Sequence, residues 1–205
     1  MRNLSRLLTA LIGGLIVGFA AYAHHSYKKS ELIANRYDDV QIGSPVEEVT
    51  YLFGDPKYVS KSANHKFQYQ VDGKGDLPPI PVGSTVSDFS EWEMDTTDDG
   101  YILYISLDQI THRLKSVMCE QFPWEKDNCP LFLTMKTGSP EDDVLAKFGQ
   151  PDKIEFENGE KTLHYFDFGL DVGLWRGKVK SLKKSQSSSF GIAKIAANEA
   201  FGLPL

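Results

Sequence analysis

One phrase, Gly43-Ser-Pro-Val-Glu-Glu-Val-Thr-Tyr-Leu-Phe-Gly-Asp-Pro56, returns without a gap as Gly138-Ser-Pro-Glu-Asp-Asp-Val-Leu-Ala-Lys-Phe-Gly-Gln-Pro151. The two copies share glycine, serine, proline, valine, phenylalanine, glycine and proline at the same offsets, and two further offsets are acidic in both. Such a match within one chain indicates an internal repeat. The repeat therefore sets the architecture that we expect.

Each copy of the phrase predicts a short helix with its own start and stop. Ser44 precedes Pro45, and Glu47 follows three residues after Ser44, which is the spacing of a capping box. The glycine and proline that close the phrase predict the helix end. We expect helices over 44–53 and 139–148. Helices this short are marginal alone, so each must pack on another element.

Alternating residues and turn signals after each helix predict antiparallel strands. The expected strands are 66–71, 91–94, 101–107 and 113–119 after the first helix, and 153–156, 162–168, 170–174 and 178–182 after the second. The sequence therefore predicts an α+β fold. It consists of two tandem helix-plus-antiparallel-strand repeats, with the helices packed on one face of a shared antiparallel sheet.

The repeats divide the chain into further parts. The expected parts are 1–23 as a signal peptide or N-terminal membrane anchor, 24–38 as a linker, 39–133 as the first repeat with a Pro- and Gly-rich insert at 72–88, 134–183 as the second repeat, and 184–205 as a Ser-rich tail with a weak helix at about 192–201. Long inserts in compact domains are often functional.

The N-terminal segment predicts export. Two arginines precede an uncharged run over 7–23, and Ala21-Tyr22-Ala23 has the small-x-small form that signal peptidase cleaves. The run is long for a signal core and short for a membrane span, which needs ~20 residues. Cleavage and retention as an anchor therefore both stay open. Either outcome predicts the periplasm or the extracytoplasmic face of the inner membrane, and membrane contact only through this segment.

The two cysteines of the chain, Cys119 and Cys129, predict a disulfide in an oxidising compartment. Closing so short a loop stabilises the fold by roughly 2–3 kcal/mol in the chain-entropy model. The spacing is not that of a Cys-x-x-Cys redox motif, and a metal site needs more ligands.

Composition and motifs argue against several functions. The net charge of −6 disfavours nucleic-acid binding. The cluster Lys178, Lys180, Lys183 and Lys184 is interpreted as a solvated strand and strand end. The sequence contains no nucleophile elbow, zinc-protease motif or phosphate-binding glycine loop. We therefore expect no catalytic residues, no metal and no cofactor. A remote alternative is a copper enzyme in which cleavage makes His24 the N-terminal ligand.

The side of the sheet that the helices leave open is the expected binding site. On the strand 101–107 the fully apolar set of alternate residues faces the helices, which puts Tyr104 on the open side. We expect the aromatics Trp92, Phe168 and Trp175 to join Tyr104, with Asp108 beside it. Exposed aromatics are typical anchors of protein interfaces. The alternative is that most of these aromatics belong to the core.

The repeated phrase, Gly-Ser-Pro-x-acidic-acidic-Val-x-x-x-Phe-Gly-x-Pro in outline, followed by strands with aromatics, resembles the BamE (SmpA/OmlA) family. It is also similar to the tandem fold of β-lactamase inhibitor proteins. The resemblance covers about residues 39–183. It implies helices packed on a small antiparallel sheet, with two such units sharing one sheet in the tandem case.

Two main hypotheses follow from the residues and the resemblance together. The first is an exported, non-catalytic module of the bacterial cell envelope that binds another protein, in envelope protein assembly or maintenance. The alternative is a secreted or periplasmic inhibitor that docks an exported enzyme such as a β-lactamase. A retained anchor favours the first and clean secretion the second.

Overall fold

The computed structural model describes residues 2–61, 68–94, 100–121, 129, 132–201 and 205, with the backbone alone at 2–13 and 19. The elements in order are α1 Arg2–Ala34, β1 Arg36–Tyr37, β2 Val40–Gln41, α2 Val46–Phe53, β3 Tyr58–Ser60, β4 Tyr69–Gln70, the 3-10 helix η1 Val86–Asp88, β5 Glu91–Met94, β6 Tyr101–Leu107, β7 Leu114–Gln121, α3 Glu141–Phe148, β8 Lys153–Glu157, β9 Glu160–Tyr165, β10 Leu170–Trp175, β11 Lys178–Ser185 and α4 Ser189–Phe201.

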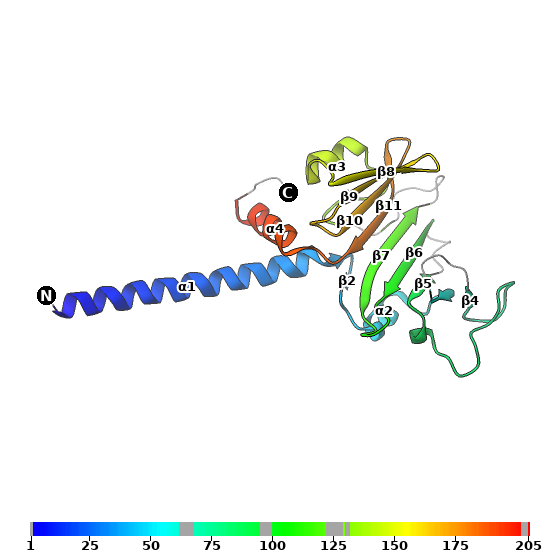
Figure 1. Cartoon of the computed structure of the whole chain (residues 1–205), viewed down its shortest axis with the longest axis horizontal. Coiled ribbons are helices and arrows are strands. Elements are labelled where there is room, and N and C mark those ends of the chain that lie inside the picture. The colour runs from blue at the N-terminus through cyan, green and yellow to red at the C-terminus, as the bar shows by residue number, and fades with distance from the viewer. Residues whose placement is uncertain (1, 62–67, 95–99, 122–128, 130–131, 202–204) are drawn as a thin grey trace.

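One large antiparallel sheet organises the chain (Figure 1). Its nine strands run in the order β4-β3-β5-β6-β7-β11-β10-β9-β8, and β1 pairs separately with β2. Strands β7 and β11 pair at the centre, so the strands that follow each helical phrase spread outward from there. The predicted α+β class and the antiparallel sheet are confirmed.

The two helical phrases make the same backbone contacts with the central strands. The amide of Gly43 donates to the Leu114 carbonyl over 2.8 Å, and the Leu114 amide donates to Ser44 over 2.8 Å. Gly138 donates to Val179, and Val179 donates to Ser139, again over 2.8 Å each. Each phrase is thus tied to the start of β7 or β11. Both leading glycines have positive φ, 95° and 81°, which favours glycine at this step.

The predicted capping box is not formed. The residues before α2 and α3 are Pro45 and Pro140, and neither helix has a side-chain cap. The Val46 amide instead donates to the His112 carbonyl over 3.2 Å, and the Glu141 amide donates to Gly177 over 3.0 Å. A carbonyl of the adjacent hairpin therefore takes the place of the serine hydroxyl. The predicted ends at Phe53 and Phe148, before the two glycines, are confirmed.

The register separates the sheet into two faces, because residues directly opposite on paired strands share a face. One row of opposed residues runs across the sheet as Trp92, Ile105, Val117, Lys184, Leu170 and Tyr165. All of them are buried. We call this side the helix face.

The short helices contribute to the core on the helix face. Val46 and Val49 of α2 and Val144 and Phe148 of α3 are buried in the same hydrophobic core as the strand residues of that face. The ring of Phe148 lies 5.5 Å from that of Tyr165, centroid to centroid. The apolar stripes of both phrases are therefore covered, as short helices require.

The linker predicted for 24–38 is instead mostly helix. Helix α1 runs for 33 residues without a break to Ala34 and extends away from the sheet (Figure 1). Helix α4 packs against the last turns of α1, and the Lys29 ammonium lies 3.6 Å from a carboxylate oxygen of Glu199. Just outside the two helices, the Ser187 amide donates to the Asn35 side chain over 2.8 Å. Within the described part of the chain, no helix is both long and apolar enough to cross a membrane.

Other boundaries differ from the predicted ones. Strand β3 was not expected, and only Tyr69–Gln70 of the predicted strand 66–71 is a strand, residues 66 and 67 lying outside the described residues. The insert 72–88 ends in η1, and its Pro78 carbonyl accepts from Gln70 over 2.9 Å. Strands β7 and β11 extend past their predicted ends at 119 and 182, because pairing with neighbouring strands continues to Gln121 and Ser185.

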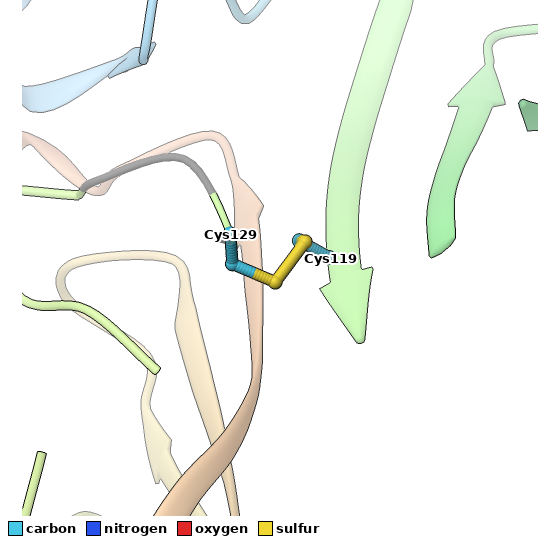
Figure 2. The surroundings of a disulfide bond; sticks show 2 residues. All are labelled: Cys119 and Cys129. Atoms are coloured by element: carbon cyan, nitrogen blue, oxygen red, sulfur yellow. A yellow bond between two sulfur atoms is a disulfide. The ribbon is translucent and has the colours of Figure 1, made fainter. Parts of the chain in front are cut away.

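The predicted disulfide between Cys119 and Cys129 is present (Figure 2). The two Cα atoms lie 5.8 Å apart, and the bond joins the end of β7 to the chain before α3. Cys119 lies on the helix face between Leu103 and Leu182 of the neighbouring strands. A disulfide of this kind indicates an oxidising, extracytoplasmic environment.

Candidate interaction surface

The side of the sheet opposite the helix face is polar, and we call it the open face. One row runs from β6 to β8 as Tyr104, Met118, Lys183, Asp171, His164 and Lys153. A second row runs as Ile102, Glu120, Ser181, Gly173, Thr162 and Glu155. The buried apolar residues of α2, α3 and α4 all belong to the core of the other face. The open face thus presents a broad, rigid surface.

Tyr104 lies at a shallow hollow of the open face. The hollow measures about 160 Å³, and its lining also includes Ser106, Ser116, Met118 and Lys183. Burial raises the pKa of Tyr104 to about 12, with the charges of Glu93 and Glu120 adding to the effect. The tyrosine is therefore a neutral hydroxyl with a partly exposed ring at physiological pH.

Lys180 forms a charged cluster beside this hollow. Its ammonium lies 2.7 Å from a Glu120 oxygen and 2.5 Å from a Glu160 oxygen. Burial lowers the pKa of Lys180, but hydrogen bonds to the two glutamates outweigh it and leave the pKa raised. The same residues, with Glu157, Asn158 and Thr162, line a second hollow of about 270 Å³.

A histidine links two carboxylates further along the open face. His164 Nδ1 lies 2.8 Å from Asp171, and His164 Nε2 lies 3.2 Å from Glu155. Glu155 also accepts a hydrogen bond from Lys153, which is the main reason that its pKa is lowered. Among the described residues, no group of three or more potential ligands is arranged to hold a metal ion.

Tyr104 and Trp175 lie on the open face, as the sequence predicts. Trp175 follows Gly173 by two residues in β10, so it shares that face, and 37% of it is exposed. The Arg176 guanidinium carbon lies 4.2 Å from the centre of the Trp175 ring. These two aromatics stand among polar side chains rather than in one aromatic cluster.

Asp108 is predicted to lie beside Tyr104, but it lies in the turn after β6 and does not line the hollow at Tyr104. Its carboxylate accepts from the amides of Ile110 and Thr111 over 3.1 and 2.8 Å, and from the Thr111 hydroxyl over 2.8 Å. The hydrogen bond from the Thr111 amide is the largest cause of its lowered pKa. Asp108 thereby orders the turn between β6 and β7, at the end of the sheet.

Trp92 and Phe168 were wrongly placed on the open face. Trp92 is 2% exposed and lies opposite Ile105 on the helix face, where its Nε1 donates to the carbonyls of Val86 and Phe89. Phe168 is buried beyond the end of β9, with its ring centroid 5.6 Å from that of Phe148. The alternative that these aromatics belong to the core is correct for both.

Lys184 is the main departure from the predicted basic cluster. It is fully buried on the helix face, next to the exposed Lys183. Its ammonium donates to the Phe168 carbonyl over 2.9 Å, to Ser187 Oγ over 3.2 Å and to the Ser185 carbonyl. Burial lowers the pKa of Lys184 to about 7. Lys184 thus ties β11 to the segment that leads into α4.

Apart from Lys180, which belongs to the predicted basic cluster, the charged residues of the open face carry no recognisable motif in the sequence. They are Glu120, Glu155, Glu160, His164 and Asp171. The sequence does contain an alternation that could have indicated a polar face: in β9, Thr162 and His164 alternate with the buried Leu163 and Tyr165. The ion pairs themselves depend on which strands become neighbours.

Comparisons with known proteins reveal no family. No known protein family matches the sequence, and no curated protein matches it. A DUF4309 family protein (YjgB) from Bacillus subtilis is 11% identical, with a TM-score of 0.42 over 76% of this chain and 97% of that chain. A cysteine-rich secretory protein (SAV1118) from Staphylococcus aureus is also 11% identical, with a TM-score of 0.38 over 73% and 46%. At these scores neither likeness bears on function.

Proposed function

We propose that this chain is an exported, non-catalytic module of the bacterial cell envelope that binds another protein through its open face. The observation that carries the proposal is the hollow at Tyr104, on a rigid sheet face between charged side chains. An aromatic anchor within a polar surround is the usual composition of a protein interface. Trp175 provides a second partly exposed aromatic on that face.

We also propose that the two halves are copies of one BamE-like unit. The equivalent hydrogen bonds of Gly43 and Gly138 support this, as does the mirrored order β3-β5-β6-β7 and β11-β10-β9-β8. The unit would bring both helical phrases to the same position relative to its last strand. Envelope protein assembly or maintenance is the role that the resemblance favours.

The N-terminal segment 1–23 is proposed as the export signal or the membrane anchor. The side chains of Leu15, Ile16 and Val17 are exposed on α1, which supports contact with an apolar environment outside this chain. The disulfide supports action beyond the cytoplasm. Determining the N-terminal residue of the protein from the envelope fraction separates cleavage from retention.

A photo-crosslinking amino acid tests the binding face. It is placed at Tyr104, and in a control at Tyr51, which is exposed on α2. Both changes replace one tyrosine by another aromatic side chain, so the variants differ mainly in the face that they report. We expect a specific crosslinked species in cells from position 104 and none from position 51. Equal products from both positions, or none from position 104, would contradict the proposal.

The same experiment separates the alternatives. If the crosslinked species is a secreted hydrolase whose activity falls when the purified chain is added, the inhibitor hypothesis replaces assembly. The copper-enzyme alternative requires His24 at the mature N-terminus and copper bound in a 1:1 ratio. His24 is exposed on α1, upstream of the sheet.

A further inference from the structure

Strand β8 is the longer of the two edge strands of the sheet, and no other described strand pairs with its outer side. It lies last in the strand order, and its five residues are all exposed. Phe156 is 75% exposed and Ile154 is 45% exposed, both on the same side of the strand. The opposite edge, β4, is only two residues long and is bridged by the insert at Pro79. Proteins usually shorten, bend or cover an edge of this kind, because it can pair with another strand.

The backbone groups of β8 that do not face β9 are those of Ile154 and Phe156. Asn158 and Gly159 form a two-residue turn with φ of 50° and 83°, as in a type I′ hairpin, so the flanking pair Glu157 and Glu160 is hydrogen-bonded. Hydrogen-bonded and non-hydrogen-bonded pairs then alternate along the ladder. This alternation makes Lys153 and His164 a hydrogen-bonded pair, with the His164 carbonyl directed toward β8. The His164 carbonyl does point that way, since it accepts from the Asp152 amide over 2.8 Å. The amides and carbonyls of residues 154 and 156 therefore point outward.

The sequence of β8, Lys-Ile-Glu-Phe-Glu, is complementary to itself in the antiparallel direction. In the register centred on Glu155, the outward groups of Ile154 meet those of Phe156 from a second copy. Lys153 then opposes Glu157 twice, and the apolar pair Ile154 and Phe156 also forms twice. Opposite charges and apolar pairs directly across a ladder are stabilising. Moving the register by two residues toward the turn places Glu155 against Glu157, which is repulsive.

Glu155 at the centre of this register does not leave two bare charges face to face. Within its own chain it accepts a hydrogen bond from Lys153 and lies 3.2 Å from His164 Nε2. A strand with outward backbone groups, matched charges and exposed apolar side chains fits a second copy of itself better than an unrelated segment.

We propose that two copies of this chain pair edge to edge through β8, about a two-fold axis at Glu155. The pairing is isologous, so it closes after two copies. One sheet then runs through both copies and carries the two open faces on the same side. This edge-to-edge pairing is independent of what the open face binds.

Single cysteines test the register, since both native cysteines are joined in the disulfide and leave no free thiol. In the full chain, Glu155→Cys places two thiols opposite each other, about 5 Å apart between Cβ atoms. We expect a covalent dimer under mild oxidation. The matched control is Lys153→Cys, which puts its two thiols four residues apart, about 13 Å along the strand, and beyond disulfide reach. Lys153→Cys mixed with Glu157→Cys should form the mixed dimer.

Sedimentation of the chain without added cysteines completes the test. The wild type should shift from one-chain to two-chain mass as its concentration rises, whereas Phe156→Lys should remain at one-chain mass with an unchanged thermal melt. Equal crosslinking of the Glu155 and Lys153 cysteine variants would overturn the proposal. So would a Phe156→Lys variant that dimerises like the wild type, because another surface would then join the copies.

Discussion

The two faces of the sheet place the same residue types in opposite surroundings. Trp92 is enclosed on the helix face, where two backbone carbonyls accept from its indole, whereas Trp175 is partly exposed on the open face beneath Arg176. Lys184 is buried among carbonyls, whereas Lys183, one residue earlier, is exposed. In a strand, position parity decides the surroundings of a side chain, because successive residues point to opposite faces. Aromatic or basic character alone therefore does not identify a surface residue here.

The largest expected contrast is between the two tryptophans. Trp92→Ala should destabilise the protein by about 3–5 kcal/mol, since it opens a cavity in the core and removes the indole N–H that donates to the Phe89 carbonyl. Trp175→Ala should cost about 1 kcal/mol or less, as for a surface residue. Urea unfolding of both variants measures the difference. Similar losses would mean that the open face is also packed against other parts of the protein.

The adjacent lysines should differ in their effect on pH dependence. The folded-state pKa of Lys184 is about 7, below the ordinary value of 10.5. Between these values the unfolded chain binds more protons than the folded one, so stability should rise as pH increases from 7 toward 10.5. From pH 7 to 9 the gain should be roughly 2 kcal/mol, at 1.36 kcal/mol per pKa unit.

Replacing either lysine by methionine isolates this contribution. Lys184→Met should remove the rise in stability between pH 7 and 9, whereas Lys183→Met, at an exposed position, should retain it. Denaturant unfolding of the wild type and both variants across this range provides the comparison. A rise that persists in Lys184→Met would assign the pH dependence to another group.

The smallest expected change in stability is at Tyr104. Tyr104→Ala should keep the fold and weaken partner binding by roughly 1–3 kcal/mol, the range for an interface anchor. Val49→Ala in α2 should do the reverse, because Val49 is fully buried in the core. Thermal melts and affinity for the crosslinked partner separate the two effects. If Tyr104→Ala unfolds the protein, the role of the open face is wrong.

Several parts of the fold were predictable from local sequence. The glycine and proline at the end of each phrase terminate its helix wherever it packs, and alternation locates β5 and β6 within their own residues. Cys119 and Cys129 are close in the chain, so their pairing needed little knowledge of the fold. For such features the deciding interactions lie within a few residues.

The side that each strand turns toward the core was less predictable. Trp92 alternates with Glu91 and Glu93, a pattern that suits a residue facing the core as well as one at an interface. Its position follows from the pairing of β5 with β6, and the sequence between these strands does not set that register. Likewise, no local signal marks the capping of α2, because the Val46 amide donates to the His112 carbonyl, which is far away in the sequence.

The sequence by itself determined where the helices of the two phrases end, most strand positions, the disulfide and the expectation of export. Only the tertiary structure decided that α1 continues through residues 24–34, that Lys184 is buried, and that Lys180 joins Glu120 and Glu160. The first group depends on backbone conformation and short-range contacts, which neighbouring residues specify. The second depends on contacts between elements far apart in the chain, such as α1 with α4 and β7 with β11, which exist only once the sheet has formed.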